Sequence, residues 1–380
     1  MLRSYWHFFA SVPLLGVVVG EAHAQIHESV NLRAGVSVLN NNNFFRASSA
    51  AVSERITTQT MGVNLAVPYS LQLFELDASL VGNQHQTNSN FDYTAQNYTA
   101  AWRWSVTPRF QGSLTSARSE TLNATNDSVD PNQRNRSTLQ NSGLSAAYQL
   151  GGPWQLTGGV STTSTINERA VVGQSDNRSS SANAGVRYVP STGNSIDYSL
   201  QESRGSSTSD YKNTGHAVST VWVVSGNTTI NARLLHSQQK FNITPQYDYS
   251  GVSGAFSLLW RLTGKTALTA SWQRDLAGYQ TAGTTHTKTD AVTLSPTWEI
   301  SPKSSVRLQY RHATRDDQGN PTGTPSNRQD SIKDLSATYS WLPRPSATLA
   351  ATISDTTNSS GVAAANYNVQ QLTLSAQFAF

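Results

Sequence analysis

The sequence predicts an all-β protein: a transmembrane antiparallel up-and-down β-barrel of about eighteen strands, with sixteen as the alternative count. Three observations support this fold class. Apolar and polar residues alternate with period two, short and long connections follow each other along the chain, and the final strand ends in phenylalanine. No stretch after Gln25 is long and apolar enough to cross a membrane as a helix. Strands are therefore the expected membrane-spanning elements.

The N-terminal 24 residues are typical of a secretory signal peptide. Arg3 precedes an apolar run, and Ala22-His23-Ala24 is the small-residue pattern that a signal peptidase cuts. A membrane anchor is the alternative, but the run is shorter than a spanning helix requires. We therefore assign residues 1–24 to a cleaved signal peptide and residues 25–380 to an outer-membrane β-barrel, and expect the protein in the cell outer membrane of a Gram-negative bacterium.

The composition narrows the function classes. The chain contains no cysteine, which excludes disulfides, thiolate metal sites and thiol catalysis. Only 13% of its residues are charged and the net charge is +4, with the basic residues scattered, so nucleic-acid binding has little support. The low charge and the many Gly, Ser, Thr and Asn residues suit neither a soluble enzyme core nor a disordered tail.

The first predicted strand shows the alternation clearly. Its apolar residues are Val30, Leu32, Ala34, Val36 and Val38, with Asn31, Arg33, Gly35 and Ser37 between them. This period is typical of a strand with one apolar and one polar face. The pattern recurs at residues 74–80 and 99–105 and continues to the end of the chain.

Short turn signals separate pairs of predicted strands. They lie at Pro68-Tyr69-Ser70, Val106-Thr107-Pro108, Gly151-Gly152-Pro153, Pro190-Ser191-Thr192-Gly193, Ser225-Gly226-Asn227, Thr263-Gly264-Lys265, Ser301-Pro302-Lys303 and Pro343-Arg344-Pro345. Longer polar stretches lie between them, for example at residues 40–54, 120–136, 205–215 and 316–328. Short periplasmic turns and longer extracellular loops are the pattern of a transmembrane barrel, whereas a soluble β-sandwich has no reason to alternate them.

Aromatic residues on the apolar parity predict a membrane girdle beside the tight turns. Its expected members are Trp102, Trp104, Trp154, Tyr188, Trp222, Trp260, Trp298 and Trp341. The last strand alternates up to Phe378 and Phe380, which we interpret as the C-terminal signal for the barrel insertion machinery.

The polar parity predicts the lining of the lumen, the path of a polymer or solute. Its charged residues are Arg33, Glu75, Asp77, Arg103, Arg109, Arg187, Asp197, Arg233, Arg261, Glu299, Arg307, Arg311 and Asp334. Eight arginines against five acids predict a mildly basic wall that favours anionic solutes. The alternative is that these side chains pair across neighbouring strands and only stabilise the wall. An eighteen-stranded barrel is wide enough for an aqueous channel unless loops narrow it.

No catalytic or metal site is expected. The histidines are dispersed and form no motif with metal-ligand spacing. An outward histidine is typical of an outer-membrane phospholipase only together with an Asn and Ser motif, and no such motif surrounds His236 or His312. Asp316-Asp317 near His312 would fit a protease dyad, but the pair is isolated, and solvated loop charge is the better interpretation. We therefore predict no enzyme activity and no cofactor.

Several stretches resemble a known family. They are the strand Val30 to Leu39 running into Asn40-Asn41-Asn42-Asn43-Phe44-Phe45-Arg46, the segment Leu76-Asp77-Ala78-Ser79-Leu80, and Tyr98 to Trp104 continuing through Pro108 to Leu114. They resemble the EpsL-like outer-membrane barrels associated with exopolysaccharide biosynthesis and exosortase (PEP-CTERM) systems. Beyond about the first 120 residues the resemblance is one of strand rhythm.

The resemblance implies an outer-membrane exit for a secreted polysaccharide, and the basic lumen would suit an acidic polymer. Outer-membrane lipid, the polysaccharide and a separate periplasmic or inner-membrane export partner would then be its partners. A general or solute-selective diffusion porin is the alternative function, and a surface structural or binding barrel is the next. A barrel that sheathes an electron-transfer partner is a further alternative.

Overall fold

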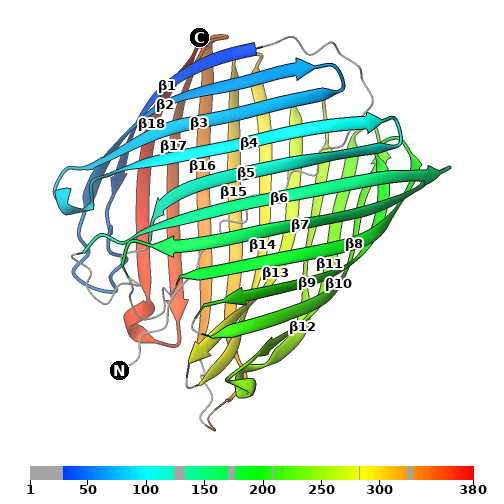
Figure 1. Cartoon of the computed structure of the whole chain (residues 1–380). Coiled ribbons are helices and arrows are strands. Elements are labelled where there is room, and N and C mark those ends of the chain that lie inside the picture. Colours follow the sequence, from blue (N-terminus) through cyan, green and yellow to red (C-terminus); the bar gives the residue numbers. More distant parts are fainter. Residues whose placement is uncertain are drawn as a thin grey trace.

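A single antiparallel sheet forms the molecule and closes on itself as a barrel of 18 strands (Figure 1). The computed structural model describes residues 29–123, 133–169, 176–207, 209–281, 283–321, 323 and 328–380. Each strand pairs with its neighbours in sequence, and the first strand pairs with the last to close the wall. The predicted fold class and strand count are therefore confirmed. The predicted signal peptide, residues 1–24, lies outside the described residues.

The strands are long, and together they occupy most of the described chain. They are β1 (Ser29–Asn41), β2 (Glu54–Tyr69), β3 (Gln72–His85), β4 (Tyr93–Thr107), β5 (Phe110–Leu122), β6 (Arg136–Gly151), β7 (Trp154–Asn167), β8 (Asn177–Ser191), β9 (Asn194–Ser206), β10 (Asp210–Ser225), β11 (Thr228–Phe241), β12 (Tyr249–Arg261), β13 (Thr266–Thr281), β14 (Thr284–Ser301), β15 (Ser304–Gln318), β16 (Gln329–Arg344), β17 (Ala347–Ser360) and β18 (Tyr367–Ala379). Three helical turns, η1 (Ser89–Phe91), η3 (Pro245–Tyr247) and η4 (Ala363–Ala365), lie in connections at one end. In the described chain, no helix is long and apolar enough to cross a bilayer.

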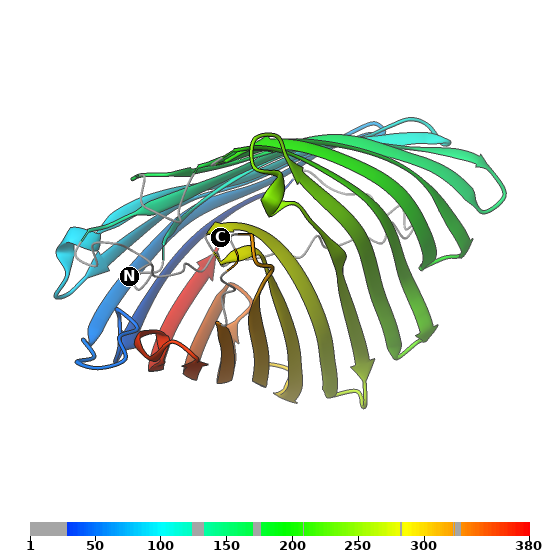
Figure 2. The same ribbon diagram turned by 90° about the horizontal axis from the view of Figure 1, so that it is seen from below.

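The strands are strongly tilted. In Figure 1, β1 to β8 pass across the front of the barrel and cross the strands behind them at a steep angle, and Figure 2 shows the wall from below. The eight predicted tight turns connect strands at one end, which we call the turn end; the other end is the loop end. Leu32 and Phe380 exchange backbone hydrogen bonds of 3.0 and 2.8 Å, so β1 starts and β18 finishes at the turn end. In an outer-membrane barrel this is the periplasmic side.

Strand pairing fixes which residues share a face. In β1, Val30 and Leu32 are more than half exposed although they are apolar, and in β2 Met61 is 70% exposed. The register places Leu32 opposite Val63 and Val63 opposite Ala78, so one parity of each strand forms a continuous apolar outer face. Such a surface fits the hydrocarbon of a bilayer. The other parity faces the interior.

The predicted girdle residues lie on the outer face at the turn end. Trp102 stacks on Phe74 with ring centroids 5.9 Å apart, and Trp154 packs against Tyr188 at 4.8 Å. Trp104 reaches across β5 because Gly112 has no side chain: a Cβ at Gly112 would clash with the indole ring. Amphipathic rings at this height are expected at the membrane interface.

One predicted loop is wrong. Residues 205–215 were expected to connect two strands, but β9 continues to Ser206 and β10 begins at Asp210, with Gly205 opposite Tyr211 and Gly215 opposite Gln201. The connection between β13 and β14 is also short. These strand ends extend beyond the apolar band and are polar on both faces, so they lack the alternation that identifies a strand.

Candidate functional site in the barrel lumen

The interior face carries most of the charges that the sequence predicted for it. Twelve of the thirteen predicted lumen residues lie in strands on the interior parity. Arg109 is the exception and corrects the prediction. It lies in the turn between β4 and β5, exposed at the turn end, because Pro108 and Arg109 are the two residues that connect these strands.

Arg33 and Asp77 form an ion pair that spans a strand. Arg33 is on β1 and Asp77 on β3, and Arg33 donates through both terminal nitrogens, with Nη1 2.5 Å from Oδ2. Gly62 of β2 lies directly opposite Arg33 and between the two partners. An ideal Cβ on Gly62 would lie 2.6 Å from Arg33 Nε. Glycine at this position therefore lets the arginine cross β2, and the bidentate geometry fixes its direction.

Three further arginine–acid pairs lie on adjacent strands. Arg103 Nε is 2.6 Å from Glu75 Oε2, and Arg311 Nη1 is 2.9 Å from Asp334 Oδ2. Arg187 also forms an ion pair with Asp197, directly opposite it on β9. Half of the eight predicted lumen arginines are therefore neutralised by wall acids, as the pairing alternative anticipated.

The other interior arginines form a different group. No ion pair within the described ranges involves Arg233, Arg261 or Arg307, and all three are exposed to the lumen. Arg261 and Arg307 lie in the same cross-strand row, with only Ala267 and Thr297 between them. At about 4.8 Å per strand, their backbones are roughly 14 Å apart. This spacing leaves room for a small anion between the two side chains.

Several further charged residues face the interior, although the sequence pattern does not mark them as interior residues. Glu54 on β2, Asp275 on β13, Asp330 on β16, and Arg315 and Asp317 on β15 share the interior parity. They lie near the loop end, where both faces of the strands are polar, so the sequence does not alternate and does not show which residues face the interior. With these acids counted, the expected basic wall is wrong for the lumen as a whole. An excess of arginine remains in the turn half, where Arg233, Arg261 and Arg307 outnumber the neighbouring interior acid Glu299.

Interior side chains of β15 and β16 pack closely near the loop end. Ala313 and Ile332 are at most 2% exposed, and so is Asp330, whose two carboxylate oxygens share a bifurcated hydrogen bond from Arg328 Nε at 2.9 and 3.0 Å. Arg315 also lies 3.9 Å from Asp330. A buried charge persists only with such partners. Interior side chains of β15 and β16 are thus packed together near the loop end, whereas Arg233, Arg261 and Arg307 are exposed nearer the turn end.

Two loop-end connections fold inward over the mouth. Phe44 of the β1–β2 connection packs 5.4 Å from both His85 and Phe91, and Phe91 is 1% exposed. Glu54 holds the β3–β4 connection: its carboxylate accepts backbone hydrogen bonds from Thr87 and Asn88, each 3.0 Å long. Because His85 and Glu54 both have interior parity, this cluster narrows the mouth, as the sequence allowed.

The wall formed by β5 to β8 carries hydroxyl groups on its interior face. Ser113 and Ser145 are 2.9 Å apart and Ser161 and Ser181 2.7 Å apart. Such a wall offers donors and acceptors without charge. In the part of the chain that the structure describes, no group of His, Cys, Asp and Glu could hold a metal ion.

No family model matches the chain, and no curated protein matches its sequence. Its fold is similar to solved structures from Pseudomonas aeruginosa. The outer membrane protein OpdK, solved with vanillate, is 13% identical, with 93% of this chain and 99% of that chain covered and a TM-score of 0.55. OccK3 (OpdO) is 15% identical, with 93% and 96% covered and a TM-score of 0.54, and OpdL is 13% identical, with 93% and 98% covered and a TM-score of 0.54. At these identities the likeness concerns the fold.

The closed sheet, its apolar outer face and these likenesses define the chain as an eighteen-stranded β-barrel of the cell outer membrane.

Proposed function

We propose that this protein is a diffusion porin that selects small anionic solutes. The observation that carries the proposal is the group of three exposed lumen arginines, Arg233, Arg261 and Arg307, which form no ion pair with the described residues of the wall. A guanidinium exposed in a water-filled wall attracts anions and lowers the barrier to their passage. Four ion pairs neutralise arginines elsewhere in the wall. Glu299, an exposed interior acid two residues nearer the turn end than Thr297, forms no ion pair in the described chain and offsets part of the charge of this group.

The narrow mouth supports a small solute. Phe44 and Phe91 pack together at the loop end, where Glu54 binds the β3–β4 connection, and the interior residues Ala313, Asp330 and Ile332 at the loop end of β15 and β16 are buried. A polysaccharide chain would require these contacts to open along its whole passage. The structural likenesses also favour the porin over the exopolysaccharide exit that the family resemblance implied, and that exit becomes the alternative outcome of the tests.

Small organic carboxylates are the solute class that fits best. An arginine recognises a carboxylate through two parallel hydrogen bonds, and the hydroxyl groups of β5 to β8 could bind other polar groups of the same molecule. OpdK was solved with vanillate, which is a carboxylate. Transport of this kind requires no catalytic residue and no cofactor.

Liposome swelling tests the proposal. The purified barrel is reconstituted into liposomes, and the rate of swelling is compared for vanillate and for a neutral solute of similar size. We expect faster uptake of vanillate in the wild type, and a loss of this preference in the Arg261→Gln/Arg307→Gln variant. Equal rates for both solutes would overturn the proposed selectivity. Absence of swelling, with loss of secreted polymer in a gene deletion, would favour the exporter.

A further inference from the structure

A row of three basic residues lies on the outer face of the barrel at the loop end. Lys212 on β10 is directly opposite Arg204 on β9 and directly opposite Lys240 on β11. All three have the parity of the lipid-facing residues Leu200, Val218 and Leu234 in the same strands, and all three are exposed. We call Arg204, Lys212 and Lys240 the basic row.

This arrangement is unfavourable for the isolated barrel. Directly opposite side chains in a sheet have Cβ atoms about 5 Å apart, and like charges there are destabilising. Glu202 compensates part of the charge, with its carboxylate 2.9 Å from both Arg204 and Lys212. In the described part of the chain Lys240 forms no ion pair, although Asp210 lies at the start of the neighbouring strand. The row thus retains an excess of positive charge.

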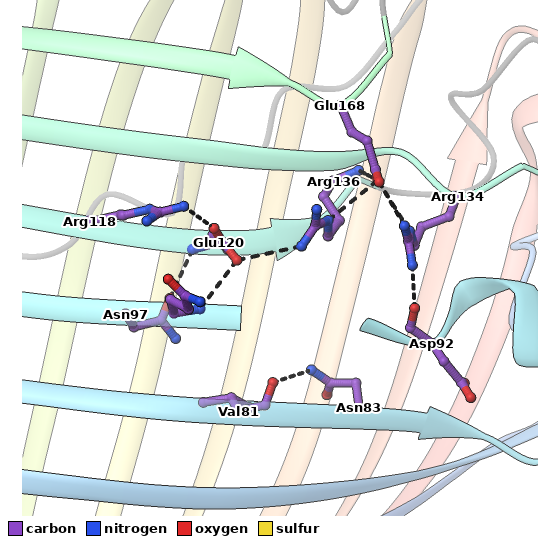
Figure 3. A network of polar contacts seen from close by, with 10 residues as sticks. Val81, Asn83, Asp92, Asn97, Arg118, Glu120, Arg134, Arg136 and Glu168 are labelled. Carbon is purple, nitrogen blue, oxygen red and sulfur yellow. Dashed lines mark hydrogen bonds and ion pairs between the residues drawn. The ribbon is translucent and has the colours of Figure 1, made fainter. Parts of the chain in front are cut away.

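Several other basic residues at this end are paired with acids of the chain. Figure 3 shows Glu120 between Arg118 and Arg136, and Glu168 between Arg136 and Arg134. Arg274 is likewise paired with Asp290 at 2.7 Å, and Lys288 lies 3.4 Å from Asp316. Arg178 on β8 and Lys333 on β16 are exposed on the same outer face and form no ion pair within the described chain. The basic row differs from them because its three members lie directly opposite one another on adjacent strands.

The position of the row relative to the apolar band points to its ligand. Below it on the same face follow Thr214 and Gln238, then His216 opposite His236, and then Val218 and Leu234, about half exposed. A lipid whose acyl chains cover Val218 and Leu234 would bring its headgroup to the level of the basic row. Phosphates of the headgroup would then lie between Lys240 and the two basic side chains, Arg204 and Lys212, that share the single carboxylate of Glu202.

We propose that Arg204, Lys212 and Lys240 bind the phosphate groups of a lipid in the outer leaflet of the outer membrane. The ammonium and guanidinium groups donate charge-assisted hydrogen bonds to the phosphate oxygens. The bound lipid removes the repulsion within the row and anchors β9 to β11 at the height of the interface. This inference is independent of the proposed transport function, because the row faces lipid and not the lumen.

Native mass spectrometry of the full barrel in detergent tests it, with bisphosphorylated lipid A as the titrated probe. The test variant is Arg204→Gln/Lys212→Gln/Lys240→Gln, and Lys333→Gln is the matched control, an exposed outward lysine of β16 outside the row. At a contribution of several-fold per basic residue, we expect the triple variant to bind lipid A on the order of 100-fold more weakly. The control should retain wild-type affinity. Heat-modifiability on gels confirms that each variant is folded.

Two further probes distinguish the source of binding. Dephosphorylated lipid A should bind the wild type as weakly as bisphosphorylated lipid A binds the triple variant. Inorganic phosphate at the concentration of the lipid should not displace it. The proposal is overturned if the triple variant binds lipid A like the wild type, if removal of the phosphates has no effect, or if inorganic phosphate alone displaces the lipid.

Discussion

Substitution of Gly62 by alanine tests whether the wall depends on the ion pair that crosses β2. The added Cβ would lie 2.6 Å from Arg33 Nε and 2.9 Å from the carbonyl oxygen of Ala78, so Arg33 must move away from Asp77. Loss of a half-exposed pair costs about 1 kcal/mol, and overpacking adds about 1 to 3 kcal/mol. Alanine stabilises a strand by roughly 0.5 to 1 kcal/mol relative to glycine, which offsets part of this cost. We expect Gly62→Ala to lower the free energy of unfolding by about 1 to 3 kcal/mol.

Urea unfolding in lipid vesicles, followed by tryptophan fluorescence, measures this change. Gly82→Ala is the matched control, because a Cβ at Gly82 of β3 meets nothing within 4 Å. We expect the control to be neutral or slightly stabilising. In an Arg33→Ala background the cost of Gly62→Ala should fall, since the clash with the guanidinium is gone. The reasoning fails if Gly62→Ala behaves like the control, or if its cost is the same in both backgrounds.

Two other substitutions test the loop end. The hydrogen bond from Arg134 holds the pKa of Glu168 below its usual 4.5. Because the folded-state pKa is depressed, the carboxylate stabilises the barrel at neutral pH, and this contribution is lost as the pH falls through the folded-state pKa. Glu168→Gln should therefore flatten the decrease in melting temperature from about pH 5 to about pH 2. An unchanged pH dependence would contradict this assignment. Glu54→Ala leaves the amides of Thr87 and Asn88 without their acceptor, so we expect faster proteolysis in residues 86–92 and a larger single-channel conductance. Substitution of the exposed Asp210 by alanine is the control. Wild-type proteolysis and conductance in Glu54→Ala would show that Glu54 does not hold the connection at the mouth.

The barrel and its strand count could be predicted because barrel strands alternate with period two and the turn chemistry is local. Val30 to Val38 and the turn at Gly151-Gly152-Pro153 carry these signals without reference to any distant residue. The signals disappear where strands extend past the apolar band. For this reason the sequence predicts a loop at residues 205–215, and the alignment of Lys212 with Arg204 and Lys240 leaves no pattern in the sequence.

The lumen could be predicted only in part. Parity identified Arg33 and Asp77 as interior residues, but their pairing depends on the register of three strands and on the absence of a side chain at Gly62. Likewise, the closure of the mouth results from contacts between Phe44 and Phe91, which belong to different connections. Such contacts follow from the closed barrel and leave no periodic pattern in the chain. The roles proposed for the girdle rings and for Phe378 and Phe380 in insertion remain predictions.

The most direct test of anion selectivity is the reversal potential of the reconstituted channel in a KCl gradient. The wild type should be anion-selective, because Arg233, Arg261 and Arg307 leave positive charge exposed in the lumen. The Arg233→Gln/Arg261→Gln/Arg307→Gln variant should lose this selectivity while it continues to conduct, and the lipid-facing Lys333→Gln variant should retain it. A wild-type channel that prefers cations, or a triple variant with unchanged selectivity, would contradict the account.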